Sequence, residues 1–313
     1  MHNKLKKSNV LINSVNTNMG VKLLNTFLRE TFPECIKKND WSVYKNKKIV
    51  VDINNYIYKF MAEDNLEGGF IHMFDTFLTY NIQPLFIFDG KAPEEKKEII
   101  KERKKERKLY VEKFKKLKYK LSRKKMLEYK RKIVKVTNKE TDKVKNIIDM
   151  YGFNYLDAPN ESDLICCKLV EVGKVYACLS EDMDMFVYGC PIVIRLYSNK
   201  NVIYEYNLKN ILNSMDISLE TFKYLSILAN NKEKNKNIFY FYKIYQNFIN
   251  NFPNQNFIEY LKKYCIIDYQ TYDHLINIYN NYSLKDNSIL SNCNYILIKN
   301  KCVNKMYINL FKK

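Results

Sequence analysis

Two pairs of acidic residues in the second half of the chain have the type and spacing of a metal site. Glu161 and Asp163 are separated by one residue, and so are Asp182 and Asp184. Neither pair contains a histidine or a cysteine. Carboxylate oxygens suit hard cations such as Mg²⁺ and Mn²⁺. In outline, the pattern indicates the two-metal site of an enzyme that cleaves phosphodiester bonds.

The elements around these pairs would bring them together. Pro159 is typical of a helix start and Asn160 of its cap, which would place the first pair in the first helical turn. Residues 175–179 are typical of a buried parallel strand, which would place the second pair at its carboxyl end. Two plainer interpretations stay open. Asn160 and Asp163 have the spacing of a capping box, and the second pair would equally fit a solvated turn.

Two earlier strands end on an aspartate in the same way. Residues 47–53 and 84–88 are predicted to be buried strands, and Asp52 and Asp89 stand at their ends. A helix is predicted between them over 67–80, and β-α-β alternation is typical of a parallel sheet with right-handed crossovers. Such sheets bind ligands at the carboxyl edge of their strands. We therefore expect acids from three strands and one helix start to converge, which favours the metal site over solvated turns.

Composition limits the class of protein. The chain has 313 residues, 46% of them hydrophobic, which is enough for one large domain or two smaller ones. We find no apolar run of membrane-spanning length and no apolar core of a secretory signal. The sequence therefore predicts a soluble intracellular monomer without a membrane partner.

The cysteines and histidines argue against two other kinds of site. There are 8 cysteines and 3 histidines, with no Cys-x-x-Cys pair and no histidine near a cysteine. A zinc site and a cysteine–histidine nucleophile therefore lack support. Free thiols in a reducing compartment are the expectation.

The positive charge is concentrated in one segment. The net charge of +19 favours a polyanionic partner, nucleic acid first and an anionic membrane second. Residues 91–135 hold 21 Lys and Arg against 7 Glu, a net of +14, and residues 94–132 have strong helical propensity. A solvated charged helix or a basic coiled-coil arm would fit this pattern. An arm that tracks phosphates is favoured, because the acidic crevice is predicted on both sides of it along the chain.

Seven short segments share their order and spacing with a known family. They are Met19-Gly20-Val21-Lys22, Val50-Val51-Asp52, Ile87-Phe88-Asp89-Gly90-Lys91-Ala92-Pro93, Val134-Lys135-Val136-Thr137, Tyr155-Leu156-Asp157-Ala158-Pro159-Asn160-Glu161-Ser162-Asp163, Gly173-Lys174-Val175-Tyr176-Ala177 and Ser180-Glu181-Asp182-Met183-Asp184. Through them the chain resembles the flap endonucleases, the XPG-type structure-specific 5′-nucleases, from Met19 to about Leu228. The resemblance implies an α/β, PIN-like fold whose central, mainly parallel sheet is flanked by helices, with a basic helical arch and a mainly α C-terminal region. The predicted organisation is a flexible basic extension over 1–18, a nuclease domain over 19–228 with its arch at about 94–135, and a divergent helical region over 229–313.

The resemblance also implies the site residues. Catalysis would fall to Lys96 and Arg103, which would hold the scissile phosphate, and to Asp182. Lys96 and Arg103 would equally fit as two ordinary residues of a crowded basic helix. Two Mg²⁺ or Mn²⁺ ions would be bound, directly or through water, by Asp52, Asp89, Glu161, Asp163, Asp182 and Asp184.

DNA contacts are implied in the same way. Tyr58 aligns with an aromatic residue on which a base can stack, although core packing would explain it equally well. Residues 104–132 would form an arch through or under which a single strand passes. The implied DNA-binding residues are Tyr58, Lys91, Lys96, Arg103, Lys104, Arg107, Lys113 and Lys116.

The resemblance breaks just after Leu228. Family members carry Gly-Ser-Asp there, whereas Lys232 takes the place of the aspartate and Glu233 is the nearby acid. Gly189 is the last glycine, so none remains for the tight turns of the duplex-binding helix-two-turn-helix. These departures weaken the expectation of a second metal site, of potassium binding and of duplex selectivity. The 18 residues before Met19 are a further departure.

The first hypothesis is a Mg²⁺-dependent 5′-nuclease that hydrolyses branched or 5′-ended DNA during replication, repair or recombination. Two alternatives stay open: a non-catalytic DNA-binding or recombination scaffold, and a ribonuclease of the same broad fold. A nuclear or viral replication site would suit the DNA-processing hypotheses. Gln246, Ile249 and Phe252 have part of a clamp-binding pattern, but Pro253 interrupts it, so no sliding-clamp partner is predicted.

Overall fold

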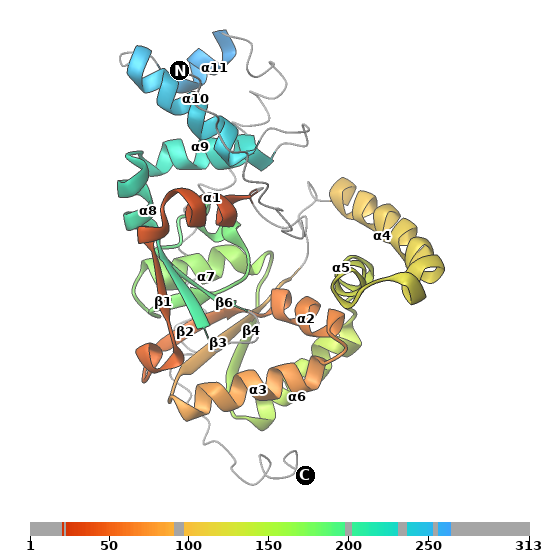
Figure 1. The fold of residues 1–313 in the computed structure, drawn as a ribbon. Helices are drawn as coiled ribbons and strands as arrows, with labels where there is room; N and C mark the ends of the chain where they lie inside the picture. Colours follow the sequence, from red (N-terminus) through yellow and green to blue (C-terminus); the bar gives the residue numbers. More distant parts are fainter. Residues whose placement is uncertain are drawn as a thin grey trace, which may run out of the picture.

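A seven-stranded sheet forms the centre of the molecule (Figure 1). The computed structural model describes residue 21 and residues 23–90, 97–197, 202–230, 237–252 and 256–263. The strand order is β1-β7-β6-β5-β2-β3-β4; pairing is parallel from β6 to β4, and β7 is antiparallel to both β1 and β6. The predicted mainly parallel sheet is therefore confirmed. The strands are β1 (Ile36–Asn39), β2 (Lys48–Asp52), β3 (Gln83–Phe88), β4 (Asn154–Asp157), β5 (Ala177–Leu179), β6 (Ile192–Tyr197) and β7 (Val202–Asn207).

Three details of the sheet differ from the prediction. β1 was not predicted because its sequence, Ile-Lys-Lys-Asn, has a single apolar residue. β7, which pairs with it, was not predicted either. β5 is shorter than the predicted strand at 175–179, because the Val175 NH donates to Leu169 O (3.3 Å) and still belongs to the preceding turn.

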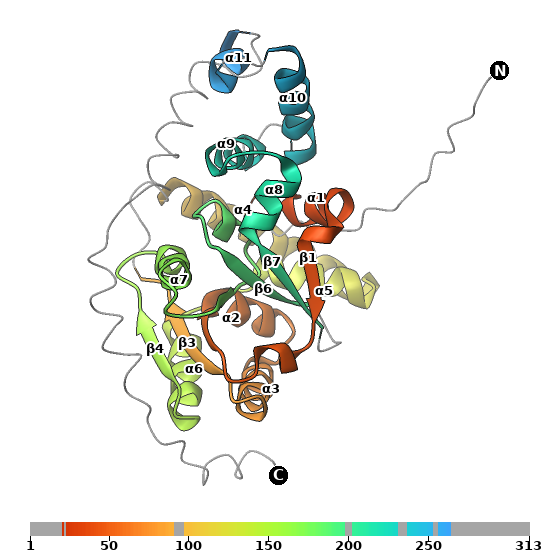
Figure 2. The ribbon, with the colours of Figure 1, turned by 90° about the vertical axis from the view of Figure 1, so that its left-hand side faces the viewer.

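Helices cover both faces of the sheet (Figure 2). The α-helices outside the basic segment are α1 (Leu24–Thr31), α2 (Ile53–Ala62), α3 (Leu66–Thr79), α6 (Asn138–Met150), α7 (Ser162–Glu171), α8 (Leu208–Met215), α9 (Leu219–Asn230), α10 (Ile238–Asn251) and α11 (Phe257–Lys263), with short 3-10 helices η1 (Pro33–Cys35), η2 (Trp41–Tyr44) and η5 (Met183–Phe186). Strand residues alternate between the two cores. Ile49, Val51 and Phe86 pack with α2, α3 and α6, whereas Val50 and Ile87 pack with α1 and α7.

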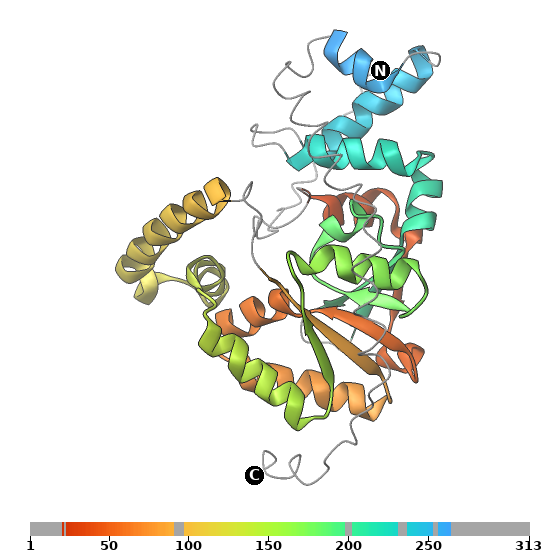
Figure 3. The same cartoon turned by 180° about the vertical axis from the view of Figure 1, so that it is seen from behind.

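The basic segment forms an arm that stands out from the sheet (Figures 1 and 3). It consists of α4 (Lys97–Leu117), the 3-10 turn η4 (Lys118–Lys120) and α5 (Arg123–Ile133). Rings pack between the two helices, with centroids 5.8 Å apart for Tyr110 and Tyr129 and 6.2 Å apart for Phe114 and Tyr129. The helical prediction for 94–132 is thus confirmed over its described part.

Ion pairs tie the arm to the body of the protein. Lys130 pairs with Asp64, and Arg131 Nη2 lies 3.9 Å from Glu63 Oε1. Both acids follow the last residue of α2, so α5 is the arm helix that contacts α2.

The C-terminal helix α10 packs on α1. The Phe27 ring lies 5.0 Å from Phe239 and 5.3 Å from Tyr242, centroid to centroid. The predicted boundary at residue 228 falls inside α9. Ile249 and Phe252, from the clamp-like pattern, pack against the same core. No helix within the described ranges is both long and apolar enough to cross a membrane.

Candidate active site

Three adjacent parallel strands end at one edge of the sheet. β2 lies between β5 and β3, and the register pairs Val51 with Leu179 and Asp52 with Ile87. Asp52 is the last residue of β2, Asp89 directly follows β3, and the 3-10 helix η5 after β5 is capped by Asp182. The strand order reverses at the β2–β5 pair, and open α/β sheets bind ligands at such switch points. The topology therefore places these acids where a ligand would bind.

Two polar side chains that the sequence analysis missed connect the ends of β2 and β5. Ser180 Oγ donates to Asp52 Oδ2 (2.8 Å) and accepts from the Asp182 NH (3.0 Å). Asn55 Nδ2 donates to Asp52 Oδ2 (2.6 Å) and to Ser180 Oγ (3.3 Å). Spacing could have indicated both residues, because Asn55 lies one helical turn after Asp52 and Ser180 lies two residues before Asp182.

The start of α7 differs from the prediction. α7 begins at Ser162, with Glu161 as its N-cap residue and no side-chain capping bond. The predicted cap at Asn160 is therefore wrong, and the capping box with Asp163 does not form. The reason is that Asn160 O accepts from the Gly90 NH (2.6 Å), which holds residue 160 against the loop after β3.

Ser162 joins α7 to two strand ends. Its backbone NH donates to Asp89 Oδ1 (2.9 Å), and its Oγ donates to Asp52 Oδ1 (3.3 Å). The loops approach so closely here that a Cβ built on Gly90 would lie 2.0 Å from Ala158 O. Gly90 therefore permits the contact that brings Asp89 to the start of α7.

Burial and mutual repulsion define the electrostatics of this cluster. Asp52 is 3% exposed, and burial, followed by the charge of Asp89, raises its pKa to about 7. Burial likewise raises the pKa of Asp163 well above its usual range, and the charges of Asp52, Asp182, Asp89 and Glu161 raise it further. Five of the six predicted acids thus act on one another.

Further hydrogen bonds hold Glu161, Asp182 and Asp184. Tyr188 Oη donates to Glu161 Oε2 (3.5 Å). Asp184 Oδ1 accepts from the Val21 NH (2.6 Å), and the Asp184 NH donates to Asp182 Oδ1 (2.8 Å). One oxygen of Asp182 therefore caps the 3-10 helix η5.

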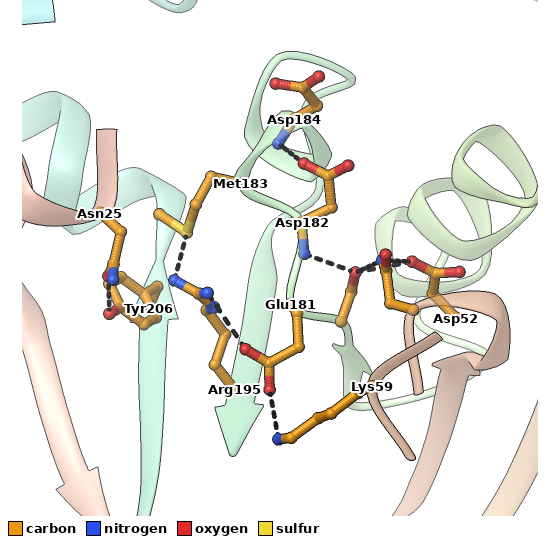
Figure 4. A network of polar contacts seen from close by, with 11 residues as sticks. Asn25, Asp52, Lys59, Glu181, Asp182, Met183, Asp184, Arg195 and Tyr206 are labelled. Carbon is orange, nitrogen blue, oxygen red and sulfur yellow. Dashed lines mark hydrogen bonds and ion pairs between the residues drawn. The ribbon is translucent and has the colours of Figure 1, made fainter. Parts of the chain in front are cut away.

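Glu181 points away from its acidic neighbours, toward two cations (Figure 4). Arg195 Nη2 lies 3.2 Å from Glu181 Oε2, and Lys59 Nζ lies 3.5 Å from Glu181 Oε1. Arg195 Nη1 also contacts Met183 Sδ at 3.3 Å. Side chains in the loop after β5 therefore alternate, so that residues 181 and 183 anchor the loop to Arg195 and residues 182 and 184 point the other way (Figure 4).

The donor chemistry of the cluster fits a hard divalent cation. All six predicted ligands are carboxylates, and Mg²⁺ keeps several waters while binding through one or two carboxylates. The like charges that raise the pKa values of Asp52 and Asp163 would be balanced by a cation. As the side chains stand, no three His, Cys, Asp or Glu residues among those described are placed to hold one ion directly. The residues therefore fit the donor chemistry of such a site.

The predicted basic residues lie on the arm or outside the described residues. Arg103 and Arg107 are on α4, with Lys104, Lys113 and Lys116, and all of these except Arg107 are exposed. The aromatic residue Tyr58 on α2 is 39% exposed, so its ring is not buried in the core. Its neighbour Tyr56 is fully buried and packs in the core instead. Lys91, Lys96, Lys232 and Glu233 lie outside the described residues.

Two family profiles match the chain. The XPG N-terminal domain matches residues 19–110, and the XPG I-region matches residues 152–231. The chain belongs to the XPG/flap endonuclease family. Flap endonuclease 1 of Homo sapiens is 29% identical over 229 residues, and that of Xenopus tropicalis is 30% identical over 230 residues. Each match covers 67% of this chain but only 60% of the relative.

Solved structures of XPG-type proteins share the fold. The catalytic core of Rad2 with a DNA substrate has a TM-score of 0.53 at 19% identity, covering 90% of this chain and 83% of that one. The flap endonuclease-1 of Methanococcus jannaschii has a TM-score of 0.52 at 21% identity, with 80% and 83% covered. GEN1 with product DNA, Mg²⁺ and Mn²⁺ has a TM-score of 0.58 at 14% identity, with 88% and 69% covered. The α/β fold expected from the sequence is therefore confirmed.

Proposed function

We propose that this XPG-family chain is a Mg²⁺- or Mn²⁺-dependent, structure-specific 5′-nuclease that hydrolyses phosphodiester bonds in branched or 5′-ended DNA. One observation carries the proposal: acids from three strand ends and the start of α7 meet around Ser162 and Asp52, and burial, followed by the charge of Asp89, raises the pKa of Asp52 to about 7. Burying like charges is unfavourable unless a cation balances them. The related Rad2 and GEN1 structures contain DNA, which supports DNA as the substrate.

The chain's own contribution to the reaction is to position the acids. Ser180 and Asn55 orient Asp52 from one side, and Ser162 orients Asp52 and Asp89 from the other. Bound divalent ions supply a nucleophilic water at neutral pH and balance charge on the leaving oxygen. The residues that would hold them, directly or through water, are Asp52, Asp89, Glu161, Asp163, Asp182 and Asp184.

Basic and aromatic groups would hold the substrate. The guanidinium of Arg103 can donate two hydrogen bonds to one phosphate and offset the charge that develops on it, and the family resemblance implies the same role for Lys96. The exposed ring of Tyr58 offers a face on which a base can stack. Exposed lysines of the arm would neutralise phosphates of the single strand.

A panel of labelled substrates tests the proposal. With Mg²⁺, we expect cleavage of a 5′-flap DNA and no cleavage in EDTA. Preferential cleavage of single-stranded RNA would indicate a ribonuclease of the same fold. Tight binding of the flap without turnover in Mg²⁺ or Mn²⁺ would indicate a DNA-binding scaffold.

A further inference from the structure

One aromatic side chain of the arm is excluded from the arm's own packing. Tyr119, in the turn η4 between α4 and α5, is 89% exposed. The other rings of the arm pack in the seam between the two helices, where Lys132 Nζ also donates to Tyr110 Oη (2.7 Å). Figures 1 and 3 show the turn at the outer end of the arm. Tyr119 therefore presents a ring to solvent at the point farthest from the sheet.

Every charged residue in the segment around Tyr119 is basic. Residues 113–127 contain eight Lys and Arg and no acid. Lys118 Nζ lies 4.6 Å from the centre of the Tyr119 ring, which places an ammonium group at its face. Sites for single-stranded nucleic acid combine cations that follow the backbone with aromatic rings on which bases stack. Leu109 and Leu117 of α4 are also exposed, but lysines and arginines flank them along the helix, whereas a membrane-bound helix presents a continuous apolar face.

We infer that Tyr119 is a stacking platform for an unpaired base of the substrate's single strand, with the lysines around it holding the flanking phosphates. The inference rests on the proposed function in that the strand is the 5′ single-stranded part of a branched DNA. α4 has 21 residues, so at 1.5 Å per residue the arm is about 30 Å long. At a rise of 3.4 Å per nucleotide, roughly nine nucleotides span that length. Tyr119 would thus act on long flaps and not on flaps of two or three nucleotides.

Binding without metal separates this inference from the catalytic proposal. The full chain is titrated in EDTA against labelled DNA carrying 5′ flaps of about 3 or 20 nucleotides. The variants are Tyr119→Ala and Tyr119→Phe, with Tyr240→Ala as the control, because Tyr240 on α10 is also exposed (41%). We expect Tyr119→Ala to weaken binding of the long flap about fivefold or more, which is the lower end of the value of one base stack. Tyr119→Phe and the control variant should bind the long flap within about twofold of wild-type affinity. Tyr119→Ala should bind the short flap within the same range.

Two results would overturn the inference. The first is unchanged long-flap binding by Tyr119→Ala, which would leave the arm as a purely electrostatic surface. The second, seen when the same variants are titrated in parallel with phosphatidylserine vesicles, is a loss confined to vesicle binding, which would assign the ring to a membrane. Failure of the catalytic proposal would be seen separately, as absence of cleavage by the wild-type chain in Mg²⁺.

Discussion

Arg195 on β6 holds Glu181 at 3.2 Å, and through Glu181 it fixes the loop that carries Asp182. Both side chains are mostly buried, 17% and 26% exposed, so their interaction is less screened than a surface ion pair. Lys59 holds the second oxygen of the same carboxylate at 3.5 Å. Glu181 is therefore a positioning residue for the acids on the other side of the loop.

Glu181→Gln should weaken the response to metal as well as the fold. The amide keeps the shape but removes the charge facing Arg195, so we expect about 1–3 kcal/mol of destabilisation in urea unfolding. Loss of a group that orients metal ligands typically costs roughly tenfold or more in metal affinity, so half-maximal cleavage should need that much more Mg²⁺.

An exposed ion pair provides the matched control for Glu181→Gln. Glu171 pairs with Lys168 at 2.6 Å and is 54% exposed, so Glu171→Gln should change stability by less than about 0.5 kcal/mol. Its Mg²⁺ dependence should equal that of wild type. Equal behaviour of the two variants would show that Arg195 does not position the loop.

Asp52→Asn should abolish cleavage yet stabilise the metal-free protein. Burial and neighbouring acids raise the pKa of Asp52 to about 7, so the folded state favours its protonated form. The unfolded pKa is about 3.9, so wild type loses stability as pH rises from about 4 toward 7. The neutral variant does not lose this stability. Its free energy of unfolding should therefore exceed that of wild type by about 2 kcal/mol more at pH 8 than at pH 5.

Urea unfolding in EDTA at the two pH values measures this difference. Mg²⁺ should then stabilise wild type more than Asp52→Asn, because ligand binding to the folded state adds to its stability. An advantage of the variant that does not grow with pH would contradict the electrostatic account of the cluster.

Gly90→Ala should separate the loop that carries Asp89 from the loop that leads into α7 and Asp163. The added Cβ would meet Ala158 O at 2.0 Å, and because that atom is backbone the loops must move apart. We expect about 1–3 kcal/mol of destabilisation, as for other overpacked sites, together with at least a tenfold loss of cleavage.

Gly173→Ala separates the activity effect from a general loss of stability. Gly173 has φ +69° and no atom within 4 Å of its added Cβ, so the change costs about 1 kcal/mol through backbone strain alone. Cleavage by this variant should match wild type. A comparable loss of activity in both variants would contradict the claim that the close approach at Gly90 is needed for cleavage.

Replacing Lys104, Lys113 and Lys116 by Gln should flatten the salt dependence of DNA binding. Each lost phosphate contact lowers the slope of log K against log salt by about 0.9 on duplex or 0.7 on single strands. The exposed lysines Lys37 and Lys38 on β1 provide the control pair, and their replacement should leave the slope unchanged. An equal change of slope in both variants would place the contacts outside the arm.

The sequence predicted the parts of the fold that depend on local patterns. β2 and β3 are apolar runs ending on an acid, so both the strands and the positions of Asp52 and Asp89 followed from pattern and topology. The edge strand β1 did not, because an exposed edge needs no apolar repeat. The predicted N-cap of α7 at Asn160 was wrong, because Asn160 is held by a contact with Gly90, 70 residues earlier in the chain.

The long-range contacts of the supporting residues needed the three-dimensional structure, whereas spacing could have indicated the local contacts of Asn55 and Ser180. Ser180 contacts Asp52 across 128 residues of sequence, and Lys59 contacts Glu181 across 122. Serine and lysine carry no pattern that names a partner at such distance. Glu181 itself is directly followed by the predicted ligand Asp182, and only the direction of its side chain separates it from the acids of the site (Figure 4).

The most direct test is single-turnover cleavage of a labelled 5′-flap DNA in Mg²⁺ by wild type and by the double variant Asp182→Ala/Asp184→Ala. Binding of the same flap in EDTA is measured in parallel. We expect Mg²⁺-dependent cleavage by wild type that is lost in the variant, with binding of the flap retained by both. Cleavage at an equal rate by both proteins, or no cleavage by wild type despite tight binding, would contradict the claim that the carboxylates at these strand ends form a catalytic metal site.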